Sequence, residues 1–139
     1  MWSFIYYDAK KKVVTISRDR LGIKPLFYSK KKNKYFFSSS IETVRKYFLN
    51  NSKININQVI KYLKKGSIFE SKSTIYNNIK LFPPGNYCQI KKNKFIFTKY
   101  WNLNNDEKFG NSSFKKFNQI INKNILKHNN YNVKTAITL

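Results

Sequence analysis

The residues most able to do chemistry form one nine-residue stretch, Arg18-Asp19-Arg20-Leu21-Gly22-Ile23-Lys24-Pro25-Leu26. A single carboxylate, that of Asp19, stands between two arginines. Gly22 can adopt a positive φ and Pro25 has a fixed φ, so the loop can be stiff. A stiff loop can hold a carboxylate against a cationic group of a substrate by a charge-assisted hydrogen bond. The other interpretation is a structural pair of Asp19 with an arginine beneath a tight turn, and the residue types leave both open.

Other reactive side chains are few. Cys88 and His128 could be imagined as a nucleophile and its base, but no motif links them. The alternation around Cys88 predicts a cysteine packed in a strand, remote from His128. One cysteine and one histidine exclude an internal disulfide and a multi-histidine or all-cysteine metal site. The sequence has no GxGxxG motif and no complete phosphate-binding loop.

The charge of the chain is strongly positive, with 28 Lys and Arg against 6 Asp and Glu, a formal net charge of +22. Such a charge suggests a small basic nucleic-acid-binding module as one function class. However, 25 of the 28 are lysines, and Lys, Asn and Ile, which all have A/T-rich codons, make 60 of 139 residues. The runs 10–12, 30–32 and 91–92 are all lysine and fall between apolar segments rich in β-formers. We therefore predict compositional bias on exposed hairpin turns spread over the surface, with no nucleic-acid partner.

Length and hydropathy place the chain among soluble proteins. Its 139 residues make one domain, or one domain and part of another, and 41% hydrophobic residues can form a core. No apolar run approaches the ~20 residues of a membrane span, and Asp8 and the first lysine run come too early for a signal peptide. We expect a cytoplasmic protein without a membrane partner.

The elements that must position the loop follow from periodicity. Alternation predicts strands over residues 2–7, 13–17, 26–28, 35–38, 86–90, 94–100 and 133–139, most of them joined as hairpins. Ser39 or Ser40 can cap a helix, Asn57 a second one that stops at Gly66, and Ser113 begins a third. This third helix carries an apolar stripe of Phe114, Phe117, Ile121 and Ile125, which we expect to face the strand 133–139.

Residues 102–112 are polar and aperiodic, which predicts a linker between two domains. The sequence begins and ends on a strand without a polar tail, so we interpret it as a fragment of a longer protein. The predicted division is residues 1–101, a linker at 102–112 and the start of a second domain at 113–139.

The loop resembles a motif of the glutamine-dependent asparagine synthetase family, of the form Arg-Asp-x-x-Gly-x-Lys/Arg-Pro-Leu. Other segments resemble the family in the same order along the chain. They are Trp2–Asp8, Phe37–Ile41, Tyr62-Leu63, Gly66, Thr74–Tyr76, Leu81, Pro84-Gly85, Tyr100-Trp101 and Val133–Leu139. Purine-pathway glutamine amidotransferases carry a similar loop, but the order from Pro-Gly through Tyr-Trp, linker and helix to the last strand favours asparagine synthetase.

The resemblance implies a fold and a reaction. Residues 1–101 would be the later part of an N-terminal-nucleophile-type glutaminase sandwich, an α+β fold of stacked antiparallel sheets with helices. Residues 113–139 would be the first helix and strand of an α/β ATP-pyrophosphatase-like domain. In the parent enzyme an N-terminal cysteine attacks glutamine and releases ammonia. The second domain uses ATP and Mg²⁺ to convert aspartate to aspartyl-AMP, which the ammonia attacks.

The resemblance also assigns roles to residues of this chain. Asp19 would hold the α-ammonium of glutamine, with Arg18, Gly22 and Pro25 supporting the loop. Thr138 and Leu139 would lie at the edge of the ATP site, just before the pyrophosphate loop.

The sequence also departs from the family. It lacks the N-terminal cysteine and the pyrophosphate loop, so we expect this polypeptide alone to be inactive. Ser40 replaces a usual Glu and Asn132 a usual Asp. A sister amidotransferase acting on another carboxylate is an alternative, and a homodimer is one expected state of the parent.

Overall fold

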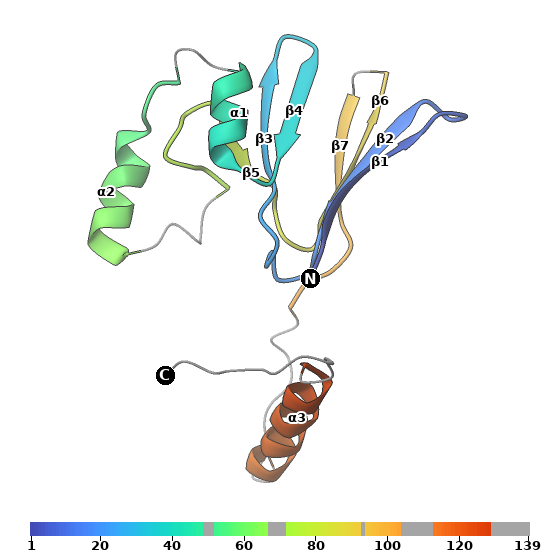
Figure 1. Ribbon diagram of the computed structural model, residues 1–139, viewed down its shortest axis with the longest axis vertical. Coiled ribbons are helices and arrows are strands. Elements are labelled where there is room, and N and C mark those ends of the chain that lie inside the picture. The colour runs from blue at the N-terminus through green and yellow to red at the C-terminus, as the bar shows by residue number, and fades with distance from the viewer. Residues whose placement is uncertain (49–51, 67–71, 93, 104–112, 129–139) are drawn as a thin grey trace. The chain divides into compact units, whose positions relative to one another are not determined.

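A computed structural model describes residues 1–48, 52–66, 72–92, 94–103 and 113–128 (Figure 1). The chain divides into two compact units, Met1–Asn102 and Leu103–Leu139. The first unit contains seven described strands and two described helices: β1 (Ser3–Asp8), β2 (Val13–Arg18), β3 (Phe27–Lys31), β4 (Lys34–Ser38), α1 (Ile41–Phe48), α2 (Ile56–Lys65), β5 (Lys80–Leu81), β6 (Asn86–Lys91) and β7 (Lys94–Lys99). The second unit contains α3 (Ser113–His128).

The larger sheet has four antiparallel strands in the order β1-β2-β6-β7. It is made of two hairpins, β1–β2 and β6–β7, which the sequence predicts, joined through the β2–β6 pair. One cross-strand row runs through Ile5, Ile16, Cys88 and Phe97. Ile16 and Cys88 are fully buried, so the two central strands supply the core of this sheet.

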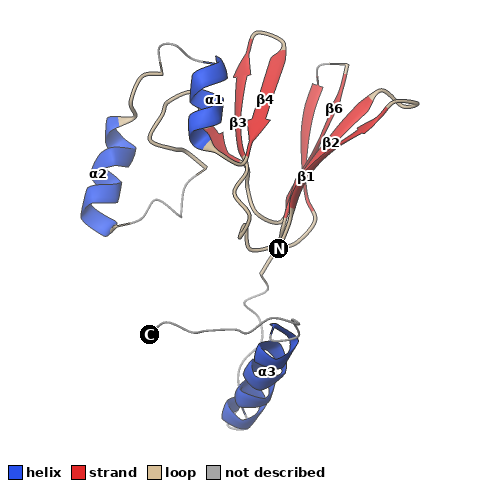
Figure 2. Ribbon diagram, viewed as in Figure 1, coloured by secondary structure: helices blue, strands red, loops and turns tan. Residues whose placement is uncertain are grey.

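The smaller sheet has the order β4-β3-β5, also antiparallel. Helix α1 lies against β3 and β4, on the side of this sheet away from the four-stranded sheet (Figure 2). Val44 of α1 and Ile79 beside β5 are fully buried. The unit is therefore layered as helix, three-stranded sheet and four-stranded sheet.

An aromatic cluster fills the space between the two sheets. The ring of Tyr28 in β3 lies 5.8 to 6.3 Å from four rings, those of Phe37, Phe82, Phe95 and Phe97. Tyr35 of β4 stacks on Phe95 with 4.9 Å between centroids. These rings contact one another across the sheets, so burial of aromatic surface holds the sheets together.

The helix boundaries agree with the sequence at most positions. Ser40 caps α1, because its Oγ accepts a hydrogen bond from the Thr43 amide at 3.4 Å. Gly66 ends α2 with φ at +69°, as predicted. The predicted cap at Asn57 is wrong: Asn55 caps α2 by accepting from the Gln58 amide. Since Ile56 and Asn57 are helical, the helix begins two residues earlier than predicted.

Helix α3 begins at Ser113 as predicted, and its apolar stripe is exposed, from 41% for Ile121 to 75% for Phe114. The strand predicted at 133–139, which we expected to cover this stripe, lies outside the described residues. No helix in the described ranges is long and apolar enough to cross a membrane.

The lysine-rich turns lie at hairpin ends and are exposed, as predicted. They are not spread over the unit, because the β1–β2, β3–β4 and β6–β7 hairpins all point towards the same end (Figure 1). Each turn holds one lysine at positive φ: Lys12 at +51°, Lys32 at +52° and Lys92 at +46°. L-residues rarely adopt this conformation, so these turns are locally strained.

Replacing Lys32 by glycine should stabilise the β3–β4 turn, because glycine adopts a positive φ without steric penalty. We expect the free energy of unfolding, measured by urea denaturation, to rise by about 0.5 kcal/mol, the left-handed penalty of lysine less the chain entropy of glycine. Lys31→Gly is the matched control, since Lys31 lies in β3 with no positive φ. The control should lose about 0.5–1 kcal/mol, and a loss in both variants would contradict the strain.

Candidate functional site

The Asp19 carboxylate organises the loop that follows β2. Its Oδ1 accepts hydrogen bonds from the amides of Leu21 at 3.2 Å and Ile23 at 3.1 Å, and its Oδ2 accepts from the Lys24 amide at 3.0 Å. Asp19 is only 5% exposed. One charged side chain thus satisfies three backbone donors that a tight loop would otherwise leave unpaired.

Arg18 donates its hydrogen bonds to backbone carbonyl groups. Its Nε donates to the Lys24 carbonyl at 2.7 Å, its Nη1 to the Phe82 carbonyl at 2.6 Å, and its Nη2 to the Gly22 carbonyl. Arg18 is 6% exposed, and burial lowers its pKa while the nearby Asp19 charge opposes that shift. The structural Asp–Arg pair that the sequence left open is therefore wrong as an ion pair, although both side chains support the loop.

Two glycines let the backbone approach these side chains. Gly22 has φ at +68°, and a Cβ there would lie 2.9 Å from Arg18 Cζ. Gly85 has φ at +63°, as a Pro-Gly turn predicts, and a Cβ there would lie 2.8 Å from the Trp101 carbonyl oxygen. The Gly85 amide donates to the Asp19 carbonyl at 3.0 Å, and its carbonyl accepts from the Tyr100 amide at 2.9 Å. The Pro-Gly turn is thus held between the loop and the end of β7.

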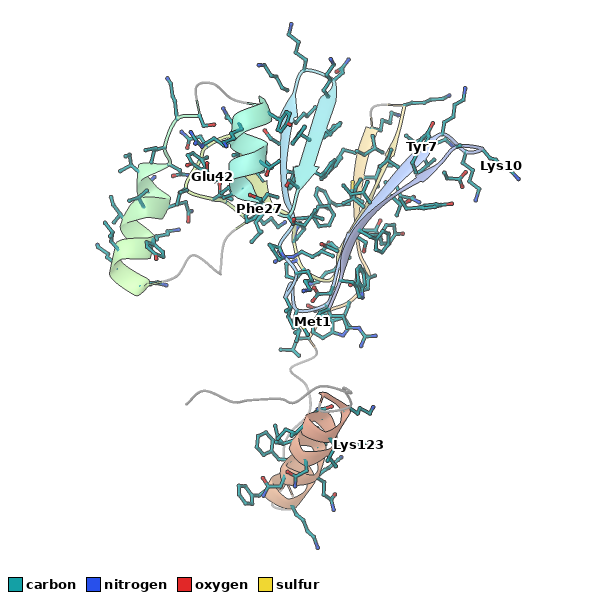
Figure 3. All side chains as sticks on the ribbon, viewed as in Figure 1. Met1, Tyr7, Lys10, Phe27, Glu42 and Lys123 are labelled. Carbon is teal, nitrogen blue, oxygen red and sulfur yellow. The ribbon has the colours of Figure 1, made fainter. Side chains whose placement is uncertain are left out.

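Tyr100 and Trp101 complete the site. The Tyr100 hydroxyl donates to the Arg18 carbonyl at 2.7 Å, and its ring stacks on Trp2 at 6.0 Å. Burial and the nearby Asp19 charge raise the pKa of Tyr100. A cleft of about 530 Å³ lies here, beside the chain start that Figure 3 labels at Met1. Its lining is Met1, Trp2, Asp19, Arg20, Leu21, Ile23, Tyr100 and Trp101.

Asp19 lines this cleft, and among the described residues its carboxylate forms no ion pair with Arg18 or Arg20. The capacity left for a ligand is small, because each carboxylate oxygen offers about two lone pairs, and three loop amides together with a backbone hydrogen bond at Trp2 already draw on these four. The direct contact with a substrate ammonium stays a prediction.

The protonation of Asp19 reflects these bonds. Burial alone would raise its pKa, but hydrogen bonds from backbone amides, that of Lys24 foremost, outweigh burial and lower the pKa below the ordinary 3.8. Asp19 is therefore anionic at neutral pH, and its charge is balanced by amide dipoles.

Cys88 is a core residue, as the sequence predicts. Its side chain is fully buried in β6, and burial raises the pKa of its thiol from 9.0 to about 12. A thiol that stays protonated at neutral pH is a poor nucleophile. The His128 side chain lies outside the described residues, so the separation of Cys88 from His128 stays a prediction.

The remaining predicted site residues divide into two groups. Thr138, Leu139 and Asn132 lie outside the described residues. Ser40 is exposed and caps α1, while Glu42 in the first turn of α1 pairs with Arg45 at 2.8 Å. Within the described ranges, no three His, Cys, Asp or Glu side chains form a group that could hold a metal ion.

Sequence reasoning found the loop but not its neighbours. Pro84-Gly85 and Tyr100-Trp101 stood out as motifs, yet nothing in their spacing indicated that they contact Asp19 and Arg18. The available signal for a close backbone approach is the aromatic pair Tyr100-Trp101 at a predicted strand end, together with a Pro-Gly turn.

Comparison with known proteins points in one direction. Residues 1–101 match a family described as glutamine amidotransferase domain. A putative glutamine-hydrolysing asparagine synthetase 2 of Methanocaldococcus jannaschii is 35% identical over 106 residues, which cover 74% of this chain and 21% of that protein. Glutamine-hydrolysing asparagine synthetases 3 and 2 of Bacillus subtilis are 23% and 28% identical over 77% and 74% of this chain, and 17% and 15% of theirs. The chain spans about a fifth or less of these relatives.

Gly85→Ala should destabilise the first unit strongly, because its Cβ would meet the Trp101 carbonyl in addition to the cost of a positive φ. We expect the free energy of unfolding to fall by about 2–4 kcal/mol. Gly66→Ala is the control, since Gly66 has φ at +69° and no atom of the described residues lies within 4 Å of the added Cβ. That variant should lose about 1 kcal/mol. Equal losses would show that the close approach at Gly85 contributes nothing.

The stabilisation by Asp19 should depend on pH. Its folded-state pKa lies below the unfolded value, so the stabilisation is complete above the unfolded pKa and is lost as pH falls through the folded pKa. Asp19→Asn should therefore lower the free energy of unfolding by about 1.5–3 kcal/mol at neutral pH, and this difference should shrink below about pH 4. Denaturation series at several pH values measure it, and a difference independent of pH would contradict the charged cap.

Proposed function

Because this chain belongs to the glutamine amidotransferase domain family, we propose that its first unit is the loop-bearing half of a domain that releases ammonia from glutamine. Family membership makes glutamine the expected substrate. The observation that carries the proposal is the coincidence of the Arg18–Leu26 motif with a cleft whose other walls come from Trp2 and Tyr100-Trp101.

We further propose that the larger protein uses this ammonia to make asparagine. The relatives' names support this, since all three are glutamine-hydrolysing asparagine synthetases. ATP and Mg²⁺ would activate aspartate as an adenylate in the second domain. The residues assigned to the ATP edge, Thr138 and Leu139, lie outside the described ranges, so this half of the reaction rests on the resemblance alone.

Asp19 acts in this proposal chiefly as a positioning residue. Its carboxylate fixes the backbone of Leu21, Ile23 and Lys24, and thereby shapes one wall of the cleft. Arg18, Gly22 and Pro25 support the same loop. Arg18 does so by donating hydrogen bonds to three carbonyl groups. Because the Cys88 thiol is fully buried and burial raises its pKa to about 12, the chemical step needs another nucleophile.

A chimaeric enzyme tests the function. The segment of the Methanocaldococcus jannaschii relative that aligns with this chain is replaced by the corresponding residues of this chain, and asparagine formation is measured with glutamine and with ammonia. We expect both activities to be retained. Synthesis from ammonia without synthesis from glutamine would contradict an amidotransferase role for residues 1–101.

Asp19→Asn in the same chimaera separates the two roles of the carboxylate. If it positions the loop, the melting temperature falls, because an amide cannot accept from both Ile23 and Lys24 in the same way, and a KM defect accompanies instability. If it binds the substrate ammonium directly, KM for glutamine rises roughly tenfold to a hundredfold at unchanged melting temperature. We expect the first result.

A further inference from the structure

One peptide group beside Asp19 is held by two aromatic residues. The carbonyl of this group belongs to Arg18 and accepts a hydrogen bond from the Tyr100 hydroxyl at 2.7 Å. Its amide belongs to Asp19 and donates to the Trp2 carbonyl at 2.9 Å. The rings of Tyr100 and Trp2 stack on each other, with centroids 6.0 Å apart and 17° between their planes. The two residues that hold this peptide group therefore also hold each other.

The peptide group on the other side of Asp19 is connected to the same tyrosine through Gly85. The Asp19 carbonyl accepts from the Gly85 amide at 3.0 Å, and the Gly85 carbonyl accepts from the Tyr100 amide at 2.9 Å. Tyr100 is thus linked to the backbone on both sides of Asp19, directly by its hydroxyl and indirectly by its amide. Because the planes of two neighbouring peptide groups define φ and ψ of the residue between them, these bonds set the direction of the Asp19 side chain.

The direction of this side chain determines the shape of the loop. The carboxylate accepts hydrogen bonds at 3.0 to 3.2 Å from three loop amides, those of Leu21, Ile23 and Lys24. Leu21 and Ile23 line the cleft together with Asp19. A rotation of the Arg18–Asp19 peptide group would shift the carboxylate and the three amides that it holds. A displacement of about 1 Å in a binding site can be costly for catalysis.

We propose that Tyr100 is a positioning residue of the glutamine site, which acts through the orientation of Asp19 and its loop. This inference rests on the proposed release of ammonia from glutamine by the first unit. The hydroxyl must stay protonated to donate to a carbonyl. Burial and the Asp19 charge raise the pKa of Tyr100, while the Arg20 charge opposes the shift, so the hydroxyl remains a donor throughout the neutral range.

Hydrogen exchange tests the positioning without catalysis. Tyr100→Phe keeps the ring that stacks on Trp2 and removes the hydroxyl. In this variant of the full chain the three loop amides should exchange about threefold to tenfold faster, as expected for the loss of one hydrogen bond. The amides of the β3–β4 hairpin should exchange as before. Unchanged exchange in the loop, or an equal rise in the loop and the hairpin, would overturn the proposal.

A second tyrosine provides a matched control. The Tyr76 hydroxyl donates to Oε1 of Glu42 in α1 at 3.3 Å. Tyr76→Phe therefore also removes one tyrosine hydroxyl and one hydrogen bond, but none in the loop that Asp19 holds. Exchange of the three loop amides should be unchanged in this variant. If both variants accelerated it to the same extent, the Tyr100 hydroxyl would have no special role and the proposal would be wrong.

Kinetics of the chimaera with the Methanocaldococcus jannaschii relative test the effect on the substrate. Tyr100→Phe should raise KM for glutamine about threefold to tenfold, while kcat with glutamine, synthesis from ammonia and the melting temperature match those of Tyr76→Phe. A parallel loss of melting temperature and of both activities would show a purely structural role and overturn the proposal. If the chimaera without these substitutions makes asparagine from ammonia only, the amidotransferase function fails, and hydrogen exchange still decides whether Tyr100 orients the loop.

Discussion

The geometry of the site depends on a division of labour between two adjacent side chains with opposite charge. Arg18 and Asp19 do not neutralise each other. The guanidinium donates hydrogen bonds to carbonyl oxygens of its own loop and of Phe82. The carboxylate accepts hydrogen bonds from amides of the same loop. A tight loop with few internal hydrogen bonds exposes backbone groups of both polarities, and each must find a partner when buried. The two charged groups supply those partners.

The sheets of the first unit hold this pair of residues in place. The aromatic cluster joins the two sheets. Within the larger sheet β2 pairs with β6, so the loop that leaves β2 meets the Pro-Gly turn that enters β6. Gly85 is where the loop, the turn and the end of β7 come closest. Cys88 packs in the core of this sheet between its cross-strand neighbours Ile16 and Phe97. Burial raises the pKa of its thiol, so it acts as an ordinary packing residue.

Much of this was predictable from local pattern. Alternation located the hairpins, and Gly66 and Ser40 marked helix ends, because these features depend on neighbours in sequence. What failed depended on distant contacts or weak local preference. Strand β5 has two residues and forms through its pairing with β3 and a bridge from Lys80 to Ser73. The α2 cap fell on Asn55 instead of Asn57, since both can serve and the bridge of Ile54 to Tyr76 fixes the entry of the chain. The loop was recognised, but the partners of Asp19 and Arg18 were not, because backbone groups carry no sequence signature.

The long-range bonds of Arg18 bear on how the protein is made. Its guanidinium donates to the carbonyl of Phe82, 64 residues later in the chain. Its carbonyl accepts from the hydroxyl of Tyr100, 82 residues later. At translation rates of 5–20 residues per second, roughly 4 to 16 s separate the synthesis of Arg18 from that of Tyr100. The β1–β2 hairpin therefore emerges from the ribosome with a cation and an anion destined for burial but still in water. The loop can close fully only after the end of β7 has left the exit tunnel, which makes this site a late step of co-translational folding.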